Sequence, residues 1–83
     1  MHVNWADIPA SQYPFLEDKK PTRLKCKDQK IYTDKKKRFY YHKDSLHGEI
    51  EMYNSRGEHL GVLTPEGNPH PKKGKVNGRK INV

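Results

Sequence analysis

The sequence predicts an α+β fold that is mainly β: a small, highly twisted antiparallel sheet with a short N-terminal helix or turn segment. Three observations predict this class. Short runs rich in β-branched and aromatic residues, typical of strands, recur between residues 29 and 63. Residues 47–54 alternate with the two-residue period of a strand. Prolines interrupt residues 1–17, which leaves room there for only one turn or a short helix.

The 83 residues are enough for one domain, within which we distinguish two parts. Residues 1–28 are expected to form an N-terminal appendage, broken at Pro9 and Pro14, and a basic linker or edge segment rich in lysine. Residues 29–83 are expected to form the sheet and a basic C-terminal tail.

Short strands are predicted at "QKIYT" and "RFYYHK", and a β-hairpin is predicted at residues 47–63 around the turn signal "NSRG". Alternation along the hairpin should bring its apolar side chains together on one buried face, namely Ile50, Met52, Leu60 and Val62. The Pro-, Gly- and Lys-rich stretch that follows predicts an irregular tail, closing with a short strand at "KINV".

The net charge of +7 favours a polyanionic partner such as nucleic acid or an anionic membrane. No apolar run approaches the ~20 residues that a membrane span needs. The single cysteine, Cys26, excludes a disulfide within the chain. Between residues 44 and 66, however, there are five acidic residues and only one basic residue, so an acidic segment lies within a basic chain.

On a strand, His47, Glu49, Glu51 and Tyr53 would point the same way, with Asp44 just before them. A polar face turned to solvent would explain this alternation. The same groups also suit RNA cleavage by internal attack, which needs a base, an acid and a cation. A carboxylate is ionised at neutral pH and can serve as the base, and a histidine among carboxylates is more readily protonated and can serve as the acid.

The string "DSLHGEIE" at residues 44–51, followed by "HLG" at 59–61, resembles the catalytic core of the ribosome-inactivating E-group colicin ribonucleases. Similar domains occur at the C-terminal ends of contact-dependent growth inhibition toxins. The resemblance runs from about Tyr32 to the C-terminus, and none is found in residues 1–28. Lys43 stands where the family pattern has a tryptophan.

The resemblance implies that Asp44, His47 and Glu51 are catalytic and that Arg79 supplies the cation, with Lys75 or Lys80 as substitutes. It further implies cleavage of 16S ribosomal RNA in the decoding region, without a metal or other cofactor. An immunity protein, which the basic charge predicts to be acidic, would protect the producing cell. The domain would be part of a larger secreted or cell-surface delivery protein and would act in the target-cell cytoplasm.

Residues expected to contact the RNA are Glu49, Tyr53, Lys35, Lys36, Lys37, Arg38 and Lys75. For Glu49, orienting His47 and merely filling the polar face are both open. The lysine run is equally consistent with a solvated turn. Two other functions remain: a metal-dependent nuclease using His42, His47 and His59 with the glutamates, and a non-catalytic RNA-binding module. The second has no need of carboxylates beside a histidine, because carboxylates repel phosphate.

Overall fold

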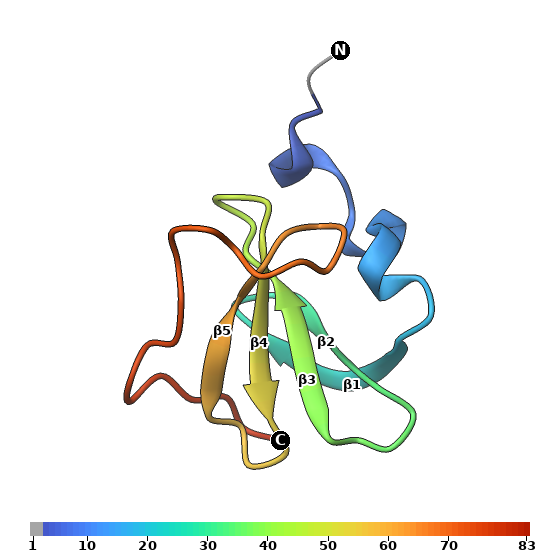
Figure 1. Cartoon of the computed structure of the whole chain (residues 1–83). Helices are drawn as coiled ribbons and strands as arrows, with labels where there is room; N and C mark the ends of the chain where they lie inside the picture. Colours follow the sequence, from blue (N-terminus) through green and yellow to red (C-terminus); the bar gives the residue numbers. More distant parts are fainter. Residues whose placement is uncertain (1–2) are drawn as a thin grey trace.

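In the computed structural model, which describes residues 3–83, the chain forms a five-stranded antiparallel sheet (Figure 1). Each strand pairs with the next one along the chain, in the order β1-β2-β3-β4-β5. The mainly-β prediction is therefore confirmed, and the predicted edge segment is β1. The strands are β1 (Lys20–Cys26), β2 (Gln29–Thr33), β3 (Phe39–Lys43), β4 (Ile50–Asn54) and β5 (His59–Leu63).

The α+β label is met only loosely, because residues 3–83 contain no α-helix. The N-terminal segment instead forms three single-turn 3₁₀ helices: η1 (Trp5–Asp7), η2 (Ala10–Gln12) and η3 (Pro14–Leu16). Pro9 caps η2 and Pro14 begins η3. Because proline has no backbone N–H, neither position can continue a helical hydrogen-bond ladder from the preceding turn. The first two residues of the predicted appendage lie outside the described residues.

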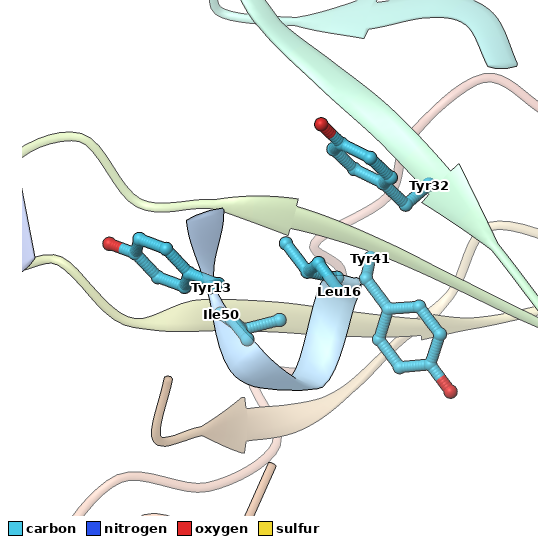
Figure 2. Close-up of a cluster of buried hydrophobic side chains, with 5 residues drawn as sticks. All are labelled: Tyr13, Leu16, Tyr32, Tyr41 and Ile50. Carbon is cyan, nitrogen blue, oxygen red and sulfur yellow. The ribbon is translucent and has the colours of Figure 1, made fainter. Parts of the chain in front are cut away.

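The N-terminal segment packs against one face of the sheet. Tyr13 and Leu16 pack against Tyr32, Tyr41 and Ile50, as Figure 2 shows. All five side chains are buried. Because the chain is poor in aliphatic residues, aromatic rings supply most of the apolar area in this core.

The opposite face carries a second, smaller core made of Ile31, Tyr53 and Ile81. Ile81 belongs to the C-terminal tail (residues 64–83), which runs back alongside β5 (Figure 1). The strand predicted at "KINV" is reduced to one bridge between Lys80 and Glu58, and the Ile81 N–H donates to the Gly57 carbonyl at 2.9 Å. Since both faces are covered, the polar face of β4 is not turned to solvent: Glu51 is only 5% exposed.

The predicted hairpin is confirmed, and Val62 is buried as predicted, but Val62 lies on the opposite face from Ile50 and Leu60 is only half-buried. Tyr53 lies opposite His59, whereas Met52 lies opposite Gly61, so Leu60 is an extra residue in β5. Such a bulge shifts the register by one residue, and a one-residue shift turns every following side chain to the other face. Val62 consequently lies opposite Glu51, and Leu63 takes its place opposite Ile50.

Candidate active site

A cleft of about 370 Å³ opens on the face of the sheet that carries Glu51. Its walls come from the β1–β2 turn, strands β3 and β4, the loop at residues 44–49 and the tail. The lining includes all four residues predicted to be catalytic, together with a residue predicted to bind substrate: Asp44, His47, Glu51, Arg79 and Tyr53. Folding thus brings the acidic segment and the basic tail to one place.

His47 lies in the loop at residues 44–49, and not on the strand as expected. Asp44 shapes this loop, because its Oδ1 accepts from the N–H groups of Leu46 (2.9 Å) and His47 (3.3 Å). Its Oδ2 accepts from His47 Nδ1 at 2.8 Å. Although burial raises the pKa of Asp44, the hydrogen bonds from His47 and the loop outweigh it and hold that pKa below its usual range.

The proton on His47 Nδ1 is therefore directed at a carboxylate, which leaves Nε2 as the nitrogen free to react. No described residue forms a hydrogen bond with Nε2, and the side chain is 51% exposed. Asp44 thus fixes the orientation of the ring, and Nε2 is the nitrogen that can exchange a proton with a substrate.

Glu51 is buried beneath the cleft and receives two donors on the same oxygen. Its Oε1 accepts from Arg79 Nη1 at 2.7 Å and from His59 Nε2 at 3.0 Å. Among residues 3–83, no hydrogen bond is made to Oε2. One oxygen is thus fixed in place, and the other is left to accept a proton from a substrate.

His59 is buried and neutral. The Val76 N–H donates to its Nδ1 at 2.9 Å, so the ring proton is on Nε2, where it is donated to Glu51. Burial lowers the pKa of His59, and this effect prevails over the attraction of Glu51. The His59 N–H also donates to the Arg79 carbonyl at 3.0 Å. His59 therefore joins Glu51 to the part of the tail that carries Arg79.

Tyr53 forms part of the buried wall of the cleft. The Lys43 carbonyl accepts from His42 Nδ1 at 3.0 Å, so His42 Nε2 accepts a hydrogen bond from the Tyr53 hydroxyl at 2.9 Å. Burial, followed by the nearby charge of Glu51, raises the pKa of Tyr53. Tyr53 therefore remains a neutral phenol whose ring is fixed by His42.

Glu49 contacts the tail, and no hydrogen bond between it and His47 is found among the described residues. Its carboxylate binds His70 Nε2 at 2.5 Å and Lys73 Nζ at 2.6 Å. The hydrogen bond to Glu49 raises the pKa of Lys73. Glu49 thereby anchors residues 70–73 of the tail to the loop that carries His47.

Among residues 3–83, Asp44, His47 and Glu49 form a group that could hold a metal ion, because their ligand atoms lie within 4.8 Å of one another. The metal site considered from the sequence is different, because it used His42 and His59. Both of those rings have their two nitrogens engaged in hydrogen bonds. In the Asp44 cluster, both oxygens of Glu49 already have partners.

A family model described as Cytotoxic matches residues 12–82, nearly the whole chain. The chain belongs to the Cytotoxic family. It is therefore a toxin domain. The match includes residues 12–28, where the sequence analysis found no resemblance, so that interpretation was wrong for these residues. No curated protein matches the sequence. Within residues 3–83, no helical segment has the length and apolar character needed to span a membrane.

The other predicted RNA contacts lie away from the cleft of this Cytotoxic domain. Residues 35–38 form the exposed β2–β3 turn, at the far end of β3 from His47 (Figure 1). The five residues of β3 span ~13 Å. Arg38 is also paired with Asp34. Lys75 is exposed and does not line the cleft; it lines a neighbouring depression of about 160 Å³ whose lining also includes Arg79.

His59 and His42 were considered from the sequence only as possible metal ligands, but both belong to the hydrogen-bonded network of the cleft. For His59 a signal was present, since it begins the "HLG" string that carries part of the resemblance. Its contact with Glu51 depends on the bulge at Leu60, which no simple alternation predicts.

Proposed function

We propose that this toxin domain is a metal-independent endoribonuclease that cuts 16S ribosomal RNA in the decoding region and so stops translation. One observation carries the proposal: His47 held by Asp44, the buried Glu51 and the half-exposed Arg79 line a single cleft. The net charge of +7 on the whole chain suits an RNA substrate.

In the proposed reaction, Oε2 of Glu51 takes the proton of a ribose 2′-hydroxyl, and the 2′-oxygen attacks the adjacent phosphorus. Arg79 stabilises the charge that develops on the phosphorane oxygens. His47, as an imidazolium supported by Asp44, donates its Nε2 proton to the 5′-oxygen as the P–O bond to it breaks. The products are a 2′,3′-cyclic phosphate and a free 5′-hydroxyl.

The purified chain is expected to release one discrete 3′ fragment of 16S RNA from intact ribosomes, with a cyclic phosphate on the upstream product. The rate should depend on pH as a bell, because one group must be deprotonated and another protonated. Gel analysis and end-group mapping of the RNA test this. Tight binding to ribosomes without any cut would identify a non-catalytic RNA-binding module.

The rival nuclease function rests on the Asp44, His47 and Glu49 cluster. A chelator separates the two mechanisms, and a short decoding-region RNA is the substrate of choice because ribosomes need Mg²⁺ to stay assembled. Cleavage in excess EDTA is expected to match cleavage without it. Activity that disappears in EDTA and returns with Zn²⁺ or Mn²⁺ would assign the reaction to a metal bound at this cluster.

We also propose that the domain is delivered into the cytoplasm of a target cell by a larger protein, and that an acidic immunity protein protects the producing cell. An acidic partner would be steered to the basic surface, giving fast association that slows as salt is added. The product of the neighbouring reading frame is expected to bind the chain and to block ribosome cleavage in the same assay. Failure to do either would contradict this partner.

A further inference from the structure

The loop that carries Asp44 and His47 rests directly on the N-terminal segment. Gly48, which follows His47, has φ of +76°, a conformation that residues with a Cβ rarely adopt. A Cβ built on Gly48 would lie 2.6 Å from the Ala6 nitrogen and 2.8 Å from the Trp5 carbonyl carbon. The two backbones are therefore in close contact, and a movement of residues 5–8 would displace the loop.

Lys43, the residue just before this loop, is only 7% exposed. Its Nζ donates to the carbonyl oxygens of Ala6 (2.8 Å) and Ile8 (2.6 Å), at the C-terminal end of η1. No carboxylate of residues 3–83 pairs with it. A buried ammonium group loses its hydration, so it is retained only where acceptors replace the water. Lys43 consequently ties the two carbonyl groups, and with them η1, to the end of β3.

Tyr13 makes a second tie from the same segment to the loop. Its side chain is fully buried, and its hydroxyl lies 2.8 Å from the Gly48 carbonyl oxygen and 2.7 Å from the Trp5 carbonyl oxygen. The single hydroxyl proton is shared between these two acceptors. Burial raises the pKa of Tyr13 to about 12, so the hydroxyl stays a donor at neutral pH. The Tyr13 and Trp5 rings also pack edge to face, 5.1 Å apart.

We propose that Lys43 and Tyr13 are positioning residues for the ribonuclease reaction: they hold residues 5–8 beneath Gly48 and thereby fix Asp44 and His47 in the cleft. This inference rests on the proposed function. The Lys43 ammonium and the Tyr13 hydroxyl are both turned to backbone carbonyls, so their loss should affect the placement of the acid more than the binding of RNA. A misplacement of ~1 Å at a reacting group can lower a rate ~10²-fold.

The test compares Lys43→Met and Tyr13→Phe with Tyr41→Phe as the matched control. Tyr41 lies in the same core as Tyr13, and no described residue accepts a hydrogen bond from its hydroxyl. Lys43→Met keeps an unbranched chain of similar length but loses the donor. Ribosome cleavage gives kcat and KM, and far-UV circular dichroism gives the folded fraction at the assay temperature. Amide hydrogen exchange is followed at Leu46, His47 and Gly48, whose N–H groups hydrogen-bond to Asp44.

We expect kcat to fall about 10- to 100-fold in Lys43→Met and about tenfold in Tyr13→Phe, with KM within about twofold of the parent. The three loop amides should exchange faster than in the parent in both variants, and at the parent rate in Tyr41→Phe. If the parent is active, the inference would be overturned by a parent-like kcat in Lys43→Met and Tyr13→Phe, or by a rise in their KM alone. An equal loss of kcat in Tyr41→Phe would also overturn it. If the parent does not cut RNA at all, the proposed function fails, and unaltered loop exchange would then overturn the positioning role separately.

Discussion

Glu51→Gln is expected to lower the single-turnover rate of ribosome cleavage about 10²- to 10⁴-fold, the usual loss when a general base is removed. Glutamine keeps a carbonyl oxygen for the two donors that now bind Oε1, Arg79 Nη1 and His59 Nε2. Its NH₂ group replaces Oε2 and cannot take a proton. The buried network should therefore survive while the base is lost.

Glu66→Gln is the matched control, because Glu66 is an exposed acid in the turn after β5 and makes the same change in net charge. It is expected to cut ribosomes at the parent rate. Thermal unfolding of the two variants checks that Glu51→Gln is folded. A folded Glu51→Gln domain with parent activity would show that another group abstracts the 2′-hydroxyl proton.

Patterns over a few residues predicted the elements whose formation depends on interactions between residues close in sequence. The turn signal at residues 54–57 and the alternation before it identified the β4–β5 hairpin, because turn chemistry and strand period act over a few residues. The register in which β5 pairs with β4 was not predictable in the same way. The extra residue at Leu60 changes the register, and nothing in its immediate sequence distinguishes it from an ordinary strand residue.

In the candidate site, too, contacts between residues close in sequence were predictable and contacts between distant residues were not. Asp44 and His47 are three residues apart, so their contact follows from the loop between them. The contact between Arg79 and Glu51 joins residues 28 apart and depends on how the tail runs beside β5. The hydrogen bonds of Lys43 could not be predicted either, because the carbonyl groups that it binds belong to the distant N-terminal segment.

Arg79→Ala is expected to reduce single-turnover cleavage about 10²- to 10³-fold, the typical loss when a preorganised donor to transition-state charge is removed. The guanidinium is 48% exposed and fixed by Glu51 at the cleft, so it can reach a phosphorane without further ordering. Arg79→Lys should rescue poorly, since an ammonium cannot reproduce two parallel hydrogen bonds to phosphoryl oxygens. Ribosome affinity should change little, because only one of 17 basic residues is lost.

Lys72→Ala and Lys75→Ala are the controls, as both residues are exposed in the same tail and carry the same charge. If the tail were only an electrostatic tether, all three variants would show equal, small losses, with the slope of affinity against salt reduced by about one unit each. A transition-state role for Arg79 instead predicts that affinity is similar in all three while cleavage collapses in Arg79→Ala alone. A collapse in Lys75→Ala would identify Lys75, which lines the neighbouring depression, as the catalytic cation in place of Arg79.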